Sequence, residues 1–222
     1  MTDPCEGWPH PRWLVHRNHG AGFDATPTPW QLPYPEHVEL CDVPAFVKYT
    51  HIDLDGDRRP ELVFTGSCTS DEVGVSRWIV NRNLGTSFAA SGESWPLPGG
   101  QAFYDLHRRV APSHMTSDVD GDGRPDLVVL SRAGTDLGTT RWLYHRNTGA
   151  GFAPAEDWCL PGGYGDDAFA SVPHESCGTF PYKPAWTLLD VDGAGPRELV
   201  VAHRCDASGS TVGIDRWLVH RR

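Results

Sequence analysis

The sequence predicts an all-β fold of repeated four-stranded antiparallel sheets, and three observations support this. An acidic segment recurs three times, short apolar runs flank each copy, and turn-forming residues are abundant between them, with 24 Gly and 19 Pro in 222 residues. Short apolar runs bounded by such residues are typical of strands joined by tight turns. The recurrence indicates a repeat protein, in which one repeat alone cannot bury its apolar face.

The acidic segment has the composition of a metal-binding loop. It reads DLDGDRRPEL from Asp53, DVDGDGRPDL from Asp118 and DVDGAGPREL from Asp190. Acidic side chains at alternate positions, a glycine and a further carboxylate at position nine form a compact set of oxygen ligands. Such sets favour hard divalent cations, above all calcium.

A second marker, the dipeptide Arg-Trp, recurs in step with the acidic segment. It begins at Arg12, Arg77, Arg141 and Arg216, so the first two intervals are almost equal and the last is longer. The first three copies continue through a glycine turn to a phenylalanine and then a second tryptophan, namely Phe23 and Trp30, Phe88 and Trp95, Phe152 and Trp158. Both markers therefore follow one nearly constant period, with insertions in the last copy.

Each complete repeat predicts four strands. The first precedes the acidic segment (45–52, 112–117 and 185–189), the second follows it (61–66, 126–131 and 198–203), the third is the Arg-Trp strand, and the fourth runs from the phenylalanine to the second tryptophan. Four antiparallel strands per repeat is the blade of a β-propeller. We expect a single repeat domain, with a tail and half-repeat at 1–44, repeats at 45–98 and 99–161, and a three-strand repeat at 162–222.

About three blades are too few for a ring, since closed propellers typically have four to eight. One hypothesis is a homodimer, in which each chain's C-terminal strands are completed by the other chain's N-terminal fourth strand to give six blades. The alternatives are a piece of a longer propeller and a compact monomer with open ends.

The motif D-x-D-G-D-x-x-x-[DE]-L, repeated among such strands, resembles the FG-GAP/VCBS repeat family. Repeats of that family form propeller blades in integrin heads and in fungal or bacterial lectins. The resemblance implies calcium held by side-chain oxygens at loop positions 1, 3, 5 and 9 and by the carbonyl at position 7. The implied ligands are Asp53, Asp55, Asp57, Arg59 and Glu61 in the first loop, Asp118, Asp120, Asp122, Arg124 and Asp126 in the second, and Asp190, Asp192 and Glu198 in the third.

The third loop departs from the pattern, because Ala194 occupies position 5, and we expect its site to be weak or empty. An EF-hand is excluded because that loop needs an acidic residue at position 12, where this chain has Phe64 and Val129. The alternative to a metal site stays open: loops in which the carboxylates accept backbone N–H bonds and hold no ion.

Two pairs of cysteines occupy matching repeat positions. Cys41 and Cys177 precede the first and third acidic loops by nearly the same interval, and Cys68 and Cys205 follow the starts of those loops by an identical interval. Because the middle repeat lacks both members, we predict Cys41–Cys68 and Cys177–Cys205 disulfides. The pairing of Cys5 and Cys159 is left open, as is the alternative of six buried thiols in a cytosolic protein. Disulfides favour a secreted or extracellular protein.

Charge and motifs exclude several function classes. The formal net charge of −10, from 19 Lys and Arg against 29 Asp and Glu, argues against a nucleic-acid partner. No apolar run is long enough to enter a bilayer as a helix. Motifs for zinc proteases, nucleophile elbows and nucleotide loops are absent. An enzyme is not expected; its only candidate residues are Asp166 and Asp167, in an insertion.

The aromatic residues favour structure over ligand binding, because most tryptophans recur at two fixed repeat positions and are expected between blades. His16, His145 and His220 also recur at one position, where structural histidines are expected. The sequence thus predicts a calcium-stabilised binding module. By resemblance to the lectin members the ligand is a carbohydrate; the alternatives are a protein partner and, third, a hydrolase or lyase site at a blade junction.

Overall fold

The computed structural model describes residues 12–33, 49–66, 72–99, 103, 113–164, 166, 168–170, 185–203 and 211–221. Within them the regular structure is entirely β, in antiparallel sheets of two, four, four and three strands. No helix long and apolar enough to cross a membrane occurs in this described part of the chain. The all-β prediction is therefore confirmed.

The strands follow the predicted repeat. The N-terminal hairpin consists of β1 (Arg12–Val15) and β2 (Thr28–Gln31). The first sheet contains β3 (Tyr49–Ile52), β4 (Glu61–Phe64), β5 (Arg77–Asn81) and β6 (Glu93–Pro96). The second sheet contains β7 (His114–Ser117), β8 (Asp126–Val129), β9 (Arg141–His145) and β10 (Glu156–Cys159). The third sheet contains β11 (Ala185–Leu189), β12 (Glu198–His203) and β13 (Leu218–His220).

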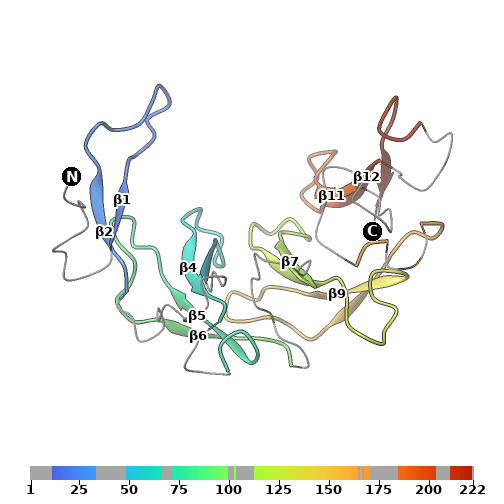
Figure 1. Cartoon of the computed structure of the whole chain (residues 1–222), viewed down its shortest axis with the longest axis horizontal. Coiled ribbons are helices and arrows are strands. Elements are labelled where there is room, and N and C mark those ends of the chain that lie inside the picture. Colours follow the sequence, from blue (N-terminus) through green and yellow to red (C-terminus); the bar gives the residue numbers. More distant parts are fainter. Residues whose placement is uncertain are drawn as a thin grey trace, which may run out of the picture.

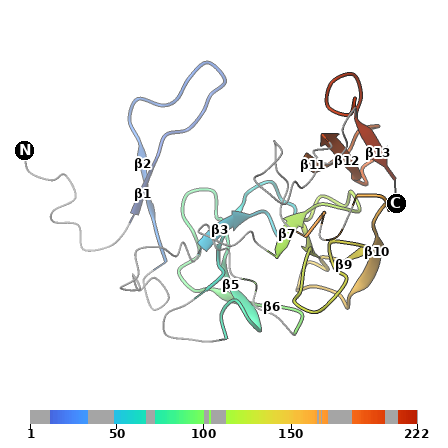
Figure 2. The same cartoon turned by 45° about the vertical axis from the view of Figure 1, so that its right-hand side comes forward.

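Strands within each sheet are ordered as they are in the sequence, and neighbours are joined by antiparallel ladders. The N-terminal hairpin and the three sheets succeed one another along an open arc (Figure 1). The hairpin and the third sheet lie at opposite ends of that arc, as the rotated view also shows (Figure 2).

The core lies within and between the sheets. All four residues of β4 and of β8, the second strands of their sheets, are buried, as expected for strands covered on both faces. The Arg-Trp tryptophans Trp78 and Trp142 are 1% and 0% exposed. Each lies opposite the second tryptophan of its own repeat, in the register pairs Trp78–Trp95 and Trp142–Trp158.

Successive repeats are joined by an aromatic contact that recurs. Phe88 of the first sheet's repeat packs edge-on against the tryptophans of the N-terminal hairpin, with ring centroids 5.5 Å from Trp13 and 5.4 Å from Trp30. Phe152 makes the same contact with the preceding Trp78 and Trp95, at 5.8 and 6.1 Å. Each such phenylalanine therefore sits on the tryptophan pair of the repeat before it.

Two of the three in-phase histidines, His16 and His145, contact a backbone carbonyl of their own repeat, which fits a structural role. The Nδ1 of His16 is 2.7 Å from the carbonyl of Asp24, and that of His145 is 3.0 Å from the carbonyl of Ala153. Asn81 at the same repeat position donates from Nδ2 to its equivalent carbonyl. These side chains tie the third strand to the segment that follows it. Burial lowers the pKa of His145 because it disfavours the charged form.

Candidate metal-binding loops

Three acidic loops connect the first and second strands of the sheets. Loop 1 spans 53–61, loop 2 spans 118–126 and loop 3 spans 190–198. Their fourth residue is a glycine with positive φ in every case, and the sixth residue also adopts positive φ. At that sixth position loops 2 and 3 have Gly123 and Gly195, whereas loop 1 has Arg58 with φ 69°. Loop 1 thus places a side chain in a backbone region that favours glycine.

Backbone N–H groups fold each loop around its carboxylates. In loop 1, Asp55 accepts a bond from the N–H of Asp57 at 3.2 Å, and Asp57 accepts one from the N–H of Arg59 at 2.8 Å. Asp120 and Asp122 accept the equivalent bonds in loop 2. These Asx turns form whether or not an ion is present, so they do not separate the two alternatives raised by the sequence.

The carboxylate at position nine of each loop accepts a hydrogen bond from the N–H of the second loop residue. Glu61 is 1% exposed and accepts a 2.8 Å hydrogen bond from the N–H of Leu54. Asp126 is fully buried and accepts bonds from the N–H groups of Val119 and Asn147. Burial raises the pKa of both Glu61 and Asp126 because it disfavours the charged form.

Three of the predicted carboxylates converge in each loop, but Glu61 and Asp126, the predicted ligands at position nine of loops 1 and 2, are not in these groups. In each loop one oxygen from each of three carboxylates lies within 4.8 Å of the other two. The groups are Asp53, Asp55 and Asp57 in loop 1, Asp118, Asp120 and Asp122 in loop 2, and Asp190, Asp192 and Glu198 in loop 3. Loop 3 therefore assembles three carboxylates despite Ala194 at position 5. These triads can hold a metal ion.

An unpartnered oxygen on the first carboxylate of loops 1 and 3 favours a bound ion. One oxygen of Asp53 accepts the N–H of Arg58, but its Oδ1 is buried and has no hydrogen-bond partner among the described residues. The Oδ1 of Asp190 is in the same situation. A buried carboxylate oxygen without a partner is costly, and a bound cation would satisfy it.

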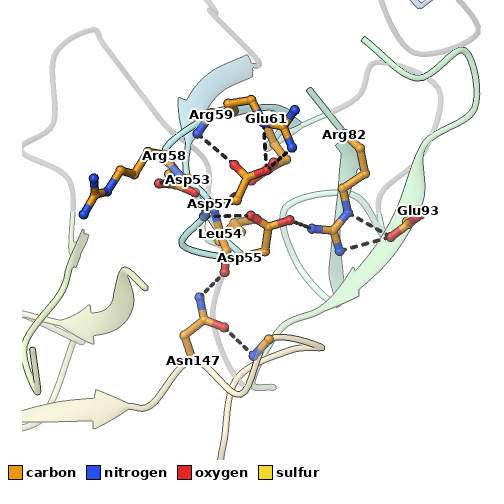
Figure 3. A network of polar contacts seen from close by, with 11 residues as sticks. Asp53, Leu54, Asp55, Asp57, Arg58, Arg59, Glu61, Arg82, Glu93 and Asn147 are labelled. Carbon is orange, nitrogen blue, oxygen red and sulfur yellow. Dashed lines mark hydrogen bonds and ion pairs between the residues drawn. The ribbon is translucent and has the colours of Figure 1, made fainter. Parts of the chain in front are cut away.

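Two arginines contact the carboxylates of loop 1 (Figure 3). Arg82, which follows β5, donates to Asp55 at 2.6 Å and contacts Glu93 at 3.3 Å. Arg59 donates from Nε to Asp57 at 2.9 Å, and its hydrogen bonding lowers the pKa of that carboxyl. These cations offset part of the repulsion among clustered carboxylates.

Loops 2 and 3 have equivalent arginines. Arg146 is 2.8 Å from Asp120, and Arg124 donates to Asp122 at 2.6 Å and lowers its pKa. Arg221 lies 3.1 Å from Asp192 and 3.6 Å from Glu198. Arg82, Arg146 and Arg221 occupy one repeat position. Each repeat therefore supplies its own arginine to pair with the carboxylates of its acidic loop.

The loops of adjacent sheets touch one another. The N–H of Arg197 in loop 3 donates to the carbonyl of Val119 in loop 2 at 3.0 Å. A Cβ built on Gly121 would lie only 2.3 Å from the carbonyl carbon of Gly195, so these loops meet backbone to backbone. Gly56 of loop 1 similarly approaches loop 2, with a built Cβ 3.1 Å from the carbonyl oxygen of Gly123.

Asn147 links loops 1 and 2 and was not singled out from the sequence. Its Nδ2 donates to the carbonyl of Leu54 at 2.8 Å (Figure 3). The Nδ2 also donates to the carbonyl of Pro125 at 3.0 Å, and the N–H of Asn147 donates to Asp126. Asn83 at the same repeat position donates to the carbonyl of Pro60. The available signal was the recurring asparagine after the Arg-Trp strand, at Asn18, Asn83 and Asn147.

Other predicted site residues lie mostly outside the described residues. Cys41, Cys68, Cys177 and Cys205 are among those outside, so both disulfides stay predictions. Cys159 is exposed and free. Of the inserted pair, Asp166 is described and Asp167 lies outside the described residues.

Comparisons with known proteins assign no family to this chain. No protein-family model matches it, and no curated protein matches it. Among solved structures, one match is a chain of the Photorhabdus luminescens Tc holotoxin pore, at 18% identity and a TM-score of 0.49. It covers 86% of this chain, which spans only 8% of the toxin chain. The resemblance to FG-GAP/VCBS repeats therefore rests on the sequence motifs.

Proposed function

We propose that this protein is a calcium-stabilised β-propeller module that functions by binding a partner molecule and not by catalysis. Two observations carry the metal site: one oxygen each of Asp53, Asp55 and Asp57 lie within 4.8 Å of one another, and Asp53 also has a buried oxygen without a hydrogen-bond partner among the described residues. The donors are all oxygens on a loop of turns, and calcium accepts such flexible oxygen sets more readily than magnesium, which demands near-ideal octahedral geometry.

Contacts between the acidic loops support the propeller arrangement. The loops that join the first two strands of adjacent sheets meet one another, as the Gly121–Gly195 and Gly56–Gly123 approaches show. Sheets that radiate from a common axis bring equivalent loops together in this way. The metal's role is then structural: it holds each hairpin loop, and with it the spacing of neighbouring sheets.

The class of ligand is the second part of the proposal. Carbohydrate is what the resemblance to lectins implies. A protein partner is favoured by a specific observation: Ile214 and Trp217, which lie close together in the sequence just before β13, are 80% and 60% exposed, whereas the equivalent tryptophans Trp78 and Trp142 are buried. Large apolar side chains that gather in one exposed patch mark protein interfaces. A secreted setting, with calcium at high concentration, is consistent with either ligand.

Calcium titration tests the metal site. We expect chelator-treated protein to bind Ca²⁺ in isothermal titration calorimetry and to gain thermal stability, with Mg²⁺ much weaker. Asp53→Asn is expected to remove one site, while Asp157→Asn, which changes an exposed carboxylate outside the loops, should leave binding unchanged. If wild-type protein shows neither heat nor a shift in melting temperature with Ca²⁺, the loops are Asx turns without an ion.

A glycan array, run in calcium, separates the ligand classes. Binding that free sugar abolishes supports a carbohydrate ligand. A blank array together with capture of a defined protein supports the alternative.

A further inference from the structure

The aromatic contact between repeats leaves one phenylalanine without a tryptophan pair to pack on and one tryptophan pair without a phenylalanine, among the described residues. Phe88 and Phe152 each sit on the tryptophan pair of the preceding repeat. Phe23 occupies the same position in the N-terminal hairpin, bridged to Asn18 as Phe88 is to Asn83 and Phe152 to Asn147, yet it is 68% exposed. Phe23 is thus presented for a contact that it does not make within the described part of the chain.

A site that could receive Phe23 lies at the other end of the arc. An open cavity of about 370 Å³ has Trp158, Cys159 and Leu160 on one side and Leu199, Val219 and His220 on the other. Trp158 and Leu160 correspond to Trp95 and Leu97, beside which Phe152 packs. The cavity therefore occupies the place where a phenylalanine of the next repeat is seated elsewhere in the molecule.

The strand that borders this cavity is weakly held. β13 has three residues, against five in the equivalent β5 and β9, and the preceding Trp217 is 60% exposed. The polar contacts described at its end are those of His220 with the hydroxyl of Tyr164 at 2.9 Å and of Arg221 with Asp192 and Glu198. In the described residues, no fourth strand pairs with β13.

The N-terminal hairpin carries the same sequence as β13. RWLVHR occurs at 12–17 and again at 216–221, without a difference. A hairpin from a second copy can therefore replace β13 beside β12, with His16 and Arg17 taking over the contacts of His220 and Arg221. It also brings what the described residues of the third sheet do not include, namely β2 as a fourth strand, Trp30 opposite Trp13, and Phe23 for the cavity.

The hairpin can dock onto a second copy and keep its contacts with the first sheet of its own chain. Trp13 packs against Tyr49, His51 and Phe88 of its first sheet, at 6.2, 5.0 and 5.5 Å. These contacts use its tryptophans, while Phe23 is exposed. Its own third sheet lies at the far end of the arc, so the cavity that it fills belongs to another molecule (Figure 2).

We propose that two copies of this chain associate head to tail, with the N-terminal hairpin of each inserted beside β12 of the other and Phe23 seated against Trp158 and Leu160. The hairpin of the second copy then takes the position that the third and fourth strands occupy in the complete internal repeats. Two such contacts close a symmetric pair, which gives six four-stranded sheets and no open edge at the junctions.

Light scattering with size-exclusion chromatography tests the association. The wild-type chain of 24.4 kDa is expected to run at twice its mass. Phe23→Ala should weaken the dimer at least tenfold, as expected for a buried aromatic anchor. Leu84→Ala, which shortens another exposed apolar side chain on a turn, should leave it unchanged. A wild-type monomer throughout the micromolar range, or a dimer insensitive to Phe23→Ala, would overturn the proposal.

Cross-linking tests the register even if Phe23→Ala folds poorly. Val200 pairs with Val219 in the third sheet, and Val15 occupies the position of Val219 in the identical segment. A Val15→Cys chain mixed with a Val200→Cys chain should give an intermolecular disulfide between these two residues, identified by peptide mass spectrometry. Leu84→Cys mixed with Val200→Cys is the control. Equal linkage in both mixtures would refute the docking, and it would leave the calcium proposal untouched.

Discussion

The second and third sheets contain the same Arg-Trp motif, but they bury it to opposite extents. Trp142 of β9 is 0% exposed, donates its Nε1–H to the carbonyl of Phe169 and packs on Trp158 and Trp186. Trp217, at the same repeat position, is 60% exposed. The motif supplies the side chain, and its burial depends on the strand and the repeat that cover it. The free energy that each tryptophan contributes should therefore differ most between these two sites.

Replacing the two tryptophans is expected to give the largest contrast. Trp142→Ala removes a fully buried indole and should lower the free energy of unfolding by about 3–5 kcal/mol. Trp217→Ala should lower it by less than about 1 kcal/mol, because the side chain is largely in water already. Urea denaturation of both variants, in dilute protein, measures the difference. Equal losses would show that Trp217 is buried in solution.

The glycines at loop position four give the next largest contrast. Gly121 and Gly193 have φ of 80° and 74°, so alanine is strained at both, by about 1–2 kcal/mol. A methyl group on Gly121 would also overlap the backbone of Gly195, whereas one on Gly193 meets nothing within 4 Å. Gly121→Ala should therefore cost about 1–3 kcal/mol more than Gly193→Ala in the free energy of unfolding. Equal costs would mean that loops 2 and 3 are apart in solution.

Exchanging the fifth loop residue tests whether it sets metal affinity. Asp122→Ala gives loop 2 the residue of loop 3, and Ala194→Asp does the reverse. Ca²⁺ at a hundred times its dissociation constant adds about 2.7 kcal/mol of stability per site. We expect Asp122→Ala to lose much of that gain and Ala194→Asp to add to it, as measured by melting temperature with and without Ca²⁺. If Ala194→Asp changes nothing, the residue at position 5 does not limit calcium binding by the third loop.

The pH dependence of the calcium effect is expected to be smaller. Burial raises the folded-state pKa of Asp126 and Glu61, so without metal their contribution favours folding at acidic pH and is lost as the pH rises through that pKa. Calcium binding needs the ionised carboxylates, so its stabilising effect grows over the same range. The Ca²⁺-dependent gain in unfolding free energy should be greater at about pH 7 than at about pH 4.5. Equal gains at the two pH values would mean that neither carboxylate titrates with metal binding.

The local structure could be predicted from the sequence because the repeats supply it. The alternating acids of Asp53–Asp55–Asp57, the glycine turns and the short apolar runs fix which residues form strands and which form loops, and the all-β fold and the carboxylate triads follow. These features depend on near neighbours along the chain, so spacing is enough to reveal them.

What only the tertiary structure decided depends on contacts between repeats. The convergence of loops through Gly121 and Gly195, the bridging bonds of Asn147, and the arginines that face each triad join segments far apart in the sequence. The identical RWLVHR segments at 12–17 and 216–221 make the reason plain: one sequence gives a strand in both places, but exposure is set by what packs against it. Local preference determined the strands and loops of this protein, and long-range packing determined which of their aromatic side chains are buried and which charged groups pair with one another.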